Sequence, residues 1–257
     1  MSKTLFITGG SRGIGAATAR RAARAGYDVA ITYVSNREAA ESVRCDIEAD
    51  GRRAVVIKAD TGNPQDIARA FREFDAALGG MDAFFNNAGI FAATAKFVDI
   101  PLVRVQQMVA VNAVGPFLCA QEAIRRMSTR LGGKGGVIVN MSSIASKVGG
   151  SHGSIDYAMT KGGIDTLTVG LAKEVAAEGI RINAVRPGLI YTDIHASAGE
   201  PDRVDRIAPQ IPLQRGGRSG RCRAVAAVGT IELRDGDARR CHGRARLVAR
   251  ASGFRTY

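Results

Sequence analysis

Short apolar runs alternate with longer amphipathic segments over most of the chain. The apolar runs predict six strands, at residues 5–7, 29–33, 54–57, 81–85, 137–140 and 181–185. The segments between them predict helices at residues 16–25, 37–49, 64–78, 103–131 and 156–177. Continuously apolar strands that alternate with helices are typical of a parallel sheet covered on both faces. We therefore predict a single-domain α/β protein with a doubly wound parallel sheet.

Length and composition agree with one soluble globular domain. A chain of 257 residues can bury a substantial core, and 46% hydrophobic and 23% charged residues are ordinary values. No run of 18 apolar residues predicts a membrane span, and a strand-like segment follows the first residues without room for a signal peptide. The cysteines show no paired spacing, so we expect reduced thiols in a cytoplasmic protein at Cys45, Cys119, Cys222 and Cys241. Since no second cluster completes Cys241-His242, no metal site is expected.

A glycine-rich turn joins the first predicted strand to the first helix. It reads Thr8-Gly9-Gly10-Ser11-Arg12-Gly13-Ile14-Gly15. Glycine lets backbone N–H groups approach a phosphate, and the N-terminus of a helix favours negative charge. Any tight turn between a strand and a helix can use glycine, but this turn lies where a dinucleotide fold holds its phosphates. The sequence therefore predicts a Rossmann-type fold that binds a dinucleotide.

The second predicted strand is followed by Val34, Ser35, Asn36 and Arg37, without an acidic residue. An Asp or Glu there would bind the ribose 2′-hydroxyl of NAD and repel the 2′-phosphate of NADP. With Arg12 in the glycine turn and Arg37 nearby, the pattern favours NADP, and NAD stays possible. The alternative is that Arg37 simply opens a solvated helix.

Tyr157 and Lys161 stand four residues apart in a predicted helix. Side chains at i and i+4 share one face of a helix. A phenol beside an ammonium group is favoured in its ionised form, which suits a proton donor and acceptor at a carbonyl. Together with the dinucleotide turn, this pair indicates hydride chemistry on a nicotinamide.

Six motifs then occur in the order and at the spacing of one enzyme family. They are Thr-Gly-x-x-x-Gly-x-Gly at 8–15, Asn-Asn-Ala-Gly at 86–89, Asn112 in Val-Asn-Ala, Ser142-Ser143, Tyr157-x-x-x-Lys161 and Arg186-Pro187-Gly188. Across residues 4–214 the chain resembles the short-chain dehydrogenases/reductases. Among these it is similar to relatives called glucose 1-dehydrogenase or 3-oxoacyl carrier-protein reductase.

The resemblance implies a role for each of four polar residues. Tyr157 would be the general acid in reduction and the base in oxidation, with Lys161 lowering its pKa and holding the nicotinamide ribose. Ser143 would polarise the substrate carbonyl, and Asn112 would anchor a proton relay toward Lys161. Ser143 is preferred because the catalytic serine of the family is usually the second of such a pair. It lies 14 residues before Tyr157, one more than in many relatives, and Ser142 stays the alternative. Ordinary polar packing is the alternative for all four.

The resemblance also implies a set of cofactor contacts. Asp60 and Thr61 would meet the adenine, although Asp60 could instead cap the helix that starts at Pro64. Asn36 and Arg37 are candidates for the 2′-phosphate. The other expected contacts, besides Tyr157 and Lys161, are Gly9, Ser11, Arg12, Ile14, Gly15, Asn87, Ala88, Gly89, Pro187, Ile190 and Thr192.

The substrate is not specified by any motif. Loops after the fourth, fifth and sixth strands are expected to shape its pocket, with Phe91, Lys147, His152, Asp156, Ile194 and His195 among their residues. We expect His152 and His195 to be rim residues rather than acid–base catalysts. Residues 191–212 resemble the mobile substrate lid of the family.

The resemblance ends near Gly217, so we divide the chain into a catalytic domain at 1–217 and an Arg-rich tail at 218–257. The net charge is +12, and residues 215–257 contain 11 Arg and no Lys against three acidic residues. One permitted choice of codons for residues 241–245, read one nucleotide later, gives Val-Thr-Gly-Ala, which the family has at its last strand. We favour a frameshift or sequencing error near residue 218 over a genuine tail that binds nucleic acid or another polyanion. Resequencing the gene decides between them.

We predict an oxidoreductase that transfers hydride between NADPH and a secondary alcohol or ketone, such as a sugar, a 3-oxoacyl thioester or a xenobiotic ketone. The resemblance implies a homotetramer, whose assembly and stability the altered C-terminal edge strand should weaken. Two rival functions are a catalytically silent dinucleotide-binding sensor or scaffold and a nucleic-acid-binding protein that acts through the tail. Neither a membrane nor a nucleic acid is an expected partner of the catalytic domain.

Overall fold

The computed structural model describes residues 2–150, 153–210 and 215–218. Its main sheet is parallel throughout and has the strand order β3-β2-β1-β4-β5-β6. The strands are β1 (Lys3–Ile7), β2 (Tyr27–Tyr33), β3 (Ala54–Lys58), β4 (Ala83–Asn86), β5 (Gly136–Met141) and β6 (Ile180–Val185). The six predicted strands and the doubly wound fold are thus confirmed. His152 and the tail from residue 219 lie outside the described residues.

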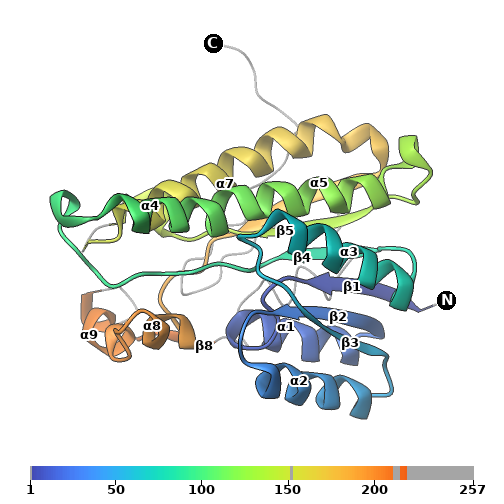
Figure 1. Ribbon diagram of the computed structural model, residues 1–257, viewed down its shortest axis with the longest axis horizontal. Helices are drawn as coiled ribbons and strands as arrows, with labels where there is room; N and C mark the ends of the chain where they lie inside the picture. The colour runs from blue at the N-terminus through green and yellow to red at the C-terminus, as the bar shows by residue number, and fades with distance from the viewer. Residues whose placement is uncertain (1, 151–152, 211–214, 219–257) are drawn as a thin grey trace.

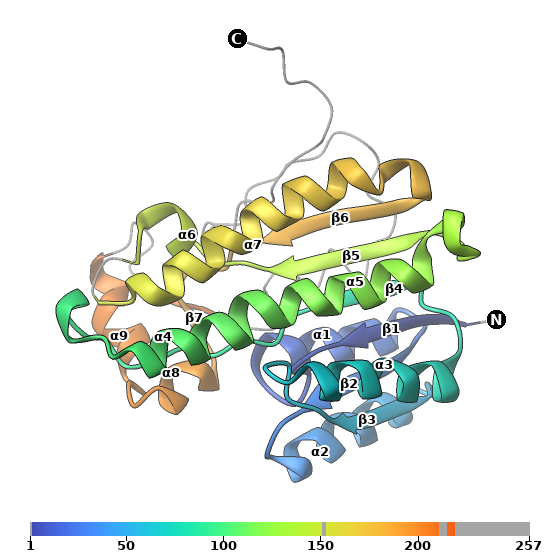
Figure 2. The same ribbon diagram turned by 45° about the horizontal axis from the view of Figure 1, so that its top comes forward.

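Helices cover both faces of this sheet, as Figures 1 and 2 show. One face carries α1 (Gly13–Arg24) and α2 (Arg37–Ala49). The other carries α3 (Pro64–Leu78), α5 (Gly115–Met127) and α7 (Ile155–Glu174). Because both faces are covered, alternate residues of a central strand enter two different cores.

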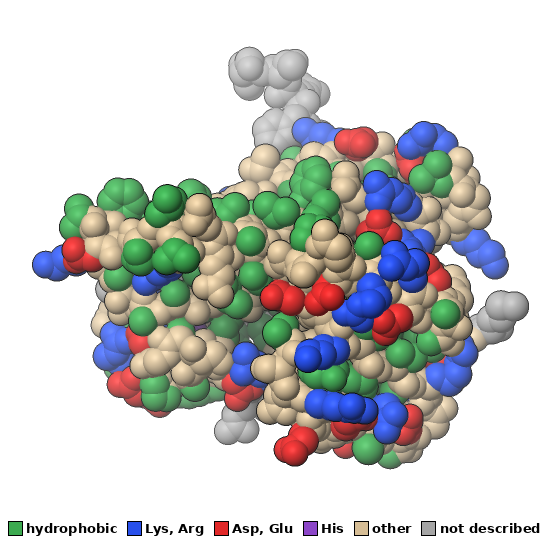
Figure 3. Space-filling view, in the orientation of Figure 1, with side chains coloured by type: hydrophobic (Ala, Val, Ile, Leu, Met, Phe, Trp, Pro, Cys, Tyr) green, Lys and Arg blue, Asp and Glu red, His purple; other side chains and the backbone are tan. Residues whose placement is uncertain are grey.

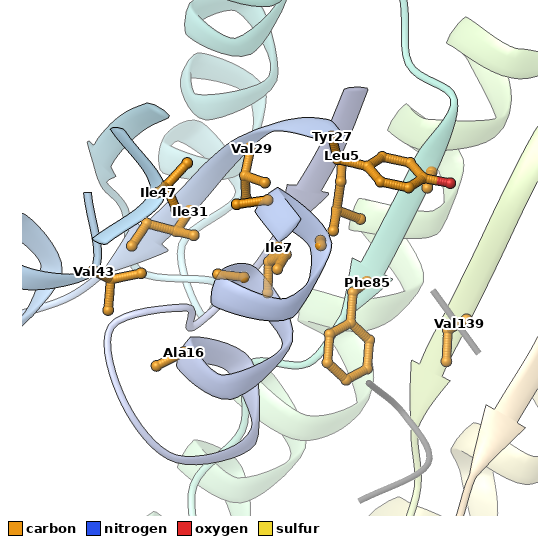
Figure 4. Close-up of a cluster of buried hydrophobic side chains, with 14 of the residues drawn as sticks. Leu5, Ile7, Ala16, Tyr27, Val29, Ile31, Val43, Ile47, Phe85 and Val139 are labelled. Carbon is orange, nitrogen blue, oxygen red and sulfur yellow. The ribbon is translucent and has the colours of Figure 1, made fainter. Parts of the chain in front are cut away.

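Successive residues of β1 show this division. Leu5 and Ile7 join a cluster under α1 and α2, which Figure 4 shows together with Val29 and Ile31. Phe6 points to the opposite core, which also contains Phe71, Phe74 and Phe84. The Phe6 ring stands edge-on to Phe71, with 4.9 Å between ring centroids, and stacks on Phe74 at 5.1 Å. These two cores fix the strand ends from which the cleft residues project.

Asparagine caps begin the two helices that follow β2 and β3. The Asn36 side chain accepts a hydrogen bond from the Ala39 N–H at 2.8 Å, and Asn63 accepts one from the Gln65 N–H at 2.9 Å. The alternative that Asp60 caps α3 is therefore wrong. Asp60 instead accepts the Gly62 N–H at 2.8 Å within the preceding turn.

The predicted helix at 103–131 is interrupted. It consists of α4 (Leu102–Val109), a π-helical segment (Ala110–Val114) and α5, followed by a 3₁₀ turn (Thr129–Leu131). Pro116 has no N–H to donate to the Asn112 carbonyl four residues before it, which breaks the regular α-helical ladder. The π-helical segment contains Asn112.

Short elements that the sequence did not predict lie over the carboxyl ends of the strands. They are α6 (Ala145–Val148), α8 (Asp193–Ser197), α9 (Arg203–Ile207) and a small parallel pair, β7 (Ile190–Tyr191) with β8 (Gly217–Arg218). Within the expected lid, Glu200 accepts a hydrogen bond from the Thr94 N–H at 2.7 Å. Residues 193–207 are thereby tied to the loop that follows β4.

Candidate active site

A cleft of about 1060 Å³ opens where the strands reach their carboxyl ends. Parallel strands meet at this edge, and a doubly wound sheet binds its ligands there. Most of the predicted site residues line the cleft: Gly9, Ser11, Arg12, Ile14, Gly15, Asn36, Asp60, Thr61, Asn87, Ala88, Gly89, Ser143, Tyr157, Lys161, Pro187, Ile190 and Thr192. Arg37 and Asn112 do not line it.

The glycine turn is built against the end of β4. Gly9 has φ of +64°, a conformation that side chains rarely adopt, and the carbonyls of Thr8 and Gly9 both accept from the Asn87 amide at 2.9 Å. A Cβ on Gly15 would lie 2.4 Å from the Gly9 carbonyl oxygen. The turn therefore requires glycine for its close packing, and it leaves the N-terminus of α1 facing the cleft.

The end of β2 separates two residues that the sequence placed together. Asn36 lines the cleft beside Ser35, while its side chain caps α2. Arg37 is exposed and pairs with Glu41, with 3.4 Å between Nε and Oε1. Arg12 lines the cleft, is exposed, and has no ion-pair partner among the described residues.

Lys161 is the one lysine among the described residues that line the cleft. It is 2% exposed, and Nζ donates to the Met141 carbonyl at 2.8 Å. Burial lowers the pKa of this amine to about 8, and the negative charge of Asp165 opposes that shift. A Cβ on Gly89 would lie 3.5 Å from Nζ, so a small residue at 89 leaves room for the amine.

Tyr157 lies one helical turn before Lys161 on the same face of α7. Nζ of Lys161 is 5.6 Å from the centroid of the phenol ring. Burial raises the pKa of Tyr157 to about 12, while a hydrogen bond with Ser143 opposes the rise. The expectation that Lys161 lowers the pKa of Tyr157 stays a prediction.

The two serines after β5 have different surroundings. Ser143 lines the cleft, hydrogen-bonds to Tyr157, and accepts the Ala145 N–H on Oγ at 3.1 Å. Ser142 is 1% exposed, and its hydroxyl donates to the Lys161 carbonyl at 3.2 Å. Ser142 thus supports the backbone of α7, whereas the Ser143 hydroxyl lies beside the phenol.

Asn112 lies behind the cleft wall rather than in it. Its side chain accepts the Ile90 N–H and donates to the Ile90 carbonyl, both at 2.8 Å, and it is fully buried. A Cβ on Gly89 would lie 3.1 Å from Oδ1 of Asn112. The π-helical segment is thereby fixed to the loop that follows β4, beside Lys161.

Residues 3–203 match the family model described as short chain dehydrogenase. The chain belongs to this family. It is 47% identical over 214 residues to the uncharacterized oxidoreductase YgfF of Escherichia coli, covering 83% of this chain and 87% of that protein. It is 34% identical over 223 residues to the 3-oxoacyl-[acyl-carrier-protein] reductase FabG of Staphylococcus aureus, covering 85% and 86%.

Solved structures agree with this assignment of the chain to the short-chain dehydrogenases. A short-chain dehydrogenase from Burkholderia cenocepacia in complex with NADP has a TM-score of 0.79 and 35% identity, and the match covers 89% of each chain. A blue fluorescent protein from a metagenomic library in complex with NADPH has a TM-score of 0.79 and 34% identity, also over 89% of each chain. This short-chain dehydrogenase is therefore an oxidoreductase with the family's fold.

Sequence reasoning missed a buried ion pair that supports α7, the helix that contains Tyr157 and Lys161. Asp165, one turn after Lys161, accepts from Nε of Arg186 at 2.8 and 2.9 Å and from the Ser146 hydroxyl at 2.7 Å. The i+4 spacing from Lys161 was the available signal. Asp156, expected to shape the substrate pocket, instead pairs with Arg104 at 2.7 Å.

We expect Lys161→Met to stabilise the folded protein at pH 7. The folded-state pKa of about 8 lies below the ordinary 10.5, so the unfolded chain binds more protons between these values. The contribution of Lys161 to the free energy of unfolding should therefore rise with pH across that window, by roughly 3 kcal/mol at most, and the variant should lack this contribution. Urea unfolding at pH 7, 8.5 and 10 measures the difference.

Lys173→Met is the matched control, because Lys173 is an exposed lysine on the same helix. It should follow the wild-type pH dependence. If the free energy of unfolding of wild type and of Lys161→Met changes equally with pH, burial does not lower the pKa of Lys161.

Proposed function

We propose that the chain reduces a ketone to a secondary alcohol with NADPH, and catalyses the reverse reaction with NADP. The observation that carries this proposal is that Ser143, Tyr157 and Lys161 line the same cleft as the glycine turn. The nucleotide, when bound, supplies or accepts the hydride. The protein side chains are left with binding, orientation and proton transfer.

Tyr157 is the proposed proton donor to the carbonyl oxygen. A pKa of about 12 keeps its phenol protonated at neutral pH, as an acid in the reductive direction requires. Ser143, which hydrogen-bonds to the phenol, donates to the same oxygen and stabilises its developing charge. In the oxidative direction Tyr157 takes the proton back.

Lys161 and Asn112 complete the proposed proton path. Lys161 has donors besides the one given to the Met141 carbonyl, and these can hold the hydroxyls of the nicotinamide ribose. Asn112 fixes the π-helical turn beside Lys161, so its backbone is the proposed anchor of the relay. A catalytically silent binding role is disfavoured, because such a protein has no need of Ser143, Tyr157 and Lys161 together.

The cofactor would lie across the strand ends. The glycine turn and the N-terminus of α1 fit the pyrophosphate, with Ser11 and Ile14 in the turn. Asp60 and Thr61 would meet the adenine. The proposed contacts of the adenosine ribose are Asn87, Ala88 and Gly89, and those of the nicotinamide are Pro187, Ile190 and Thr192.

Three observations support NADP over NAD. No acidic residue lines the cleft at the end of β2, where Ser35 and Asn36 stand. The Arg12 guanidinium lies beside the cleft and has no carboxylate partner in the described part of the chain. Two of the similar structures hold NADP or NADPH. We therefore assign the 2′-phosphate to Arg12 and Asn36, with Arg37 as the more distant candidate.

Tyr157→Phe should lower kcat for ketone reduction by about 10²–10⁴-fold, because the proton donor is removed while the ring remains. The assay follows NADPH consumption with acetophenone and with acetoacetyl-CoA, and NADP reduction with glucose. NADPH should still raise the melting temperature of the variant. Tyr27→Phe is the control, because Tyr27 is buried in β2 outside the cleft lining.

Wild-type rates in Tyr157→Phe would refute the assigned role of the phenol. Nucleotide binding by wild type without turnover of any probe would favour the silent binding protein instead.

Arg12→Ala should lower the preference for NADPH over NADH, expressed as a ratio of kcat/KM values, by about tenfold or more. A hydrogen bond to a charged group contributes roughly 1.5–3 kcal/mol, and only NADPH has the phosphate. Arg37→Ala, the matched control, should change this ratio less than about threefold, because Arg37 pairs with Glu41. The opposite order of the two variants would move the phosphate site to Arg37.

The outer face of the helices α4, α5 and α7 supports a partner proposal. Figure 3 shows hydrophobic side chains gathered over α4, where Leu102 is 71% and Val103 70% exposed. Phe117 on α5 and Met159 on α7 are also exposed. The segment Leu102–Met127 is long and apolar enough to span a membrane by length and composition, yet α5 packs on β4 and β5.

We propose that two copies of the chain pair through this face, and that assembly stops at this dimer rather than the expected homotetramer because the C-terminal edge strand is altered. Light scattering should give twice the mass of the chain, and Phe117→Arg should give the mass of one chain, because a charge would be buried at the contact. Leu131→Arg is the control, since Leu131 is similarly exposed but lies in the 3₁₀ turn after α5. A monomeric wild type would contradict the proposal.

A further inference from the structure

A second, smaller cavity of about 390 Å³ adjoins the reaction cleft. It lies among the loop after β4, helix α4 and helix α8, and Arg104, Met108 and Ala198 are among its lining residues. The wall that it shares with the cleft consists of Arg12, Gly89, Ile90, Phe91, Gln107 and Ile194. Phe91 is the one aromatic residue in this wall.

The Phe91 ring also borders the proposed proton donor. It stands edge-on to the Tyr157 ring, with 5.1 Å between centroids and an interplanar angle of 81°. On another side it meets the His195 ring of α8 at 5.9 Å and 79°. A carbonyl group held by Tyr157 and Ser143 would therefore have one of its two substituents next to Phe91.

A cation and an ion pair also hold the Phe91 ring in place. The Arg203 guanidinium lies 4.7 Å from the ring centroid, and Arg203 is 7% exposed. Glu200 accepts from Nη1 of Arg203 at 2.8 Å and from the Thr94 N–H at 2.7 Å. The Phe91 ring, which extends from the loop that follows β4, is thus held against α8 and α9.

We propose that Phe91 limits the size of the smaller substituent of the ketone and closes the side cavity to substrate. The protein would accordingly take ketones with one bulky and one short substituent, such as methyl ketones. One extra methylene changes the specificity of an apolar pocket by about 10–200-fold, so a ring at this position is a strong filter. The inference rests on the proposed ketone reduction.

The test compares acetophenone, propiophenone and butyrophenone, whose alkyl substituents are methyl, ethyl and propyl. With NADPH, wild-type kcat/KM should fall about tenfold or more from the methyl to the propyl ketone. In Phe91→Ala the side cavity joins the cleft, so the propyl-to-methyl ratio of kcat/KM should rise about tenfold or more above that of wild type. The propyl-to-methyl ratio of Phe91→Leu should lie between those of wild type and Phe91→Ala.

Phe97→Ala is the matched control. Phe97 lies in the same connection between β4 and α4, is 69% exposed, and lines neither cavity. Its ketone profile should equal that of wild type. Thermal melts with NADPH show which variants fold and bind nucleotide. If Phe91→Ala does not fold, the ketone profile of Phe91→Leu is compared with that of wild type instead.

The propyl-to-methyl ratio of kcat/KM distinguishes selection of the ketone substituent by Phe91 from structural support of Tyr157 by Phe91. If Phe91 only steadies Tyr157, both Phe91 variants lower kcat for all three ketones alike, and the inference is overturned. It is also overturned if wild type reduces the three ketones equally. A wild type that reduces neither the three ketones nor acetoacetyl-CoA, and that does not oxidise glucose with NADP, refutes the proposed function itself.

Discussion

The burial of the Lys161 ammonium group is the constraint on which the site depends. Lys161 is 2% exposed, so its N–H donors need hydrogen-bond acceptors within the protein. The Met141 carbonyl at the end of β5 is one such acceptor. The glycine at 89 and the Asn112 side chain, held by Ile90, shape the space beside it. Three separate stretches of the chain therefore meet at one buried amine, whose burial costs stability. A buried charge that costs stability is typical of a functional site.

The parallel sheet explains how these stretches come together. Every strand of the main sheet ends at the same edge, so the glycine turn after β1, the loop after β4 and the serines after β5 become neighbours. The glycine turn that precedes α1 and the residues that precede α2 line the half of the cleft proposed for the nucleotide. The lid helices add the other half, where Phe91, His195 and Arg203 pack together beside Tyr157.

Sequence patterns predicted the regular elements well and the local exceptions poorly. Pro64 after Asn63 marked the start of α3. Pro116 was the available signal for a break in the predicted helix at 103–131, but a proline does not specify that the break is a π-helical turn. Helices of five residues, such as α8, are too short to have a period. The spacing brought Tyr157 and Lys161 together, but their pKa values depend on burial, which only the fold sets. Likewise, Asn36 caps α2 and lines the cleft, whereas Arg37, the first residue of α2, points to solvent and pairs with Glu41.

The central claim is that a carbonyl carbon receives hydride from NADPH while Tyr157 protonates its oxygen. The most direct measurement is deuterium transfer from NADPH deuterated at nicotinamide C4 to acetophenone, followed by mass spectrometry and NMR of the alcohol. The account predicts deuterium at the carbinol carbon, on one face only, and formation of this product about 10²–10⁴-fold more slowly by Tyr157→Phe. Alcohol without deuterium from either C4-deuterated epimer, or labelled alcohol formed equally fast by Tyr157→Phe, would contradict it.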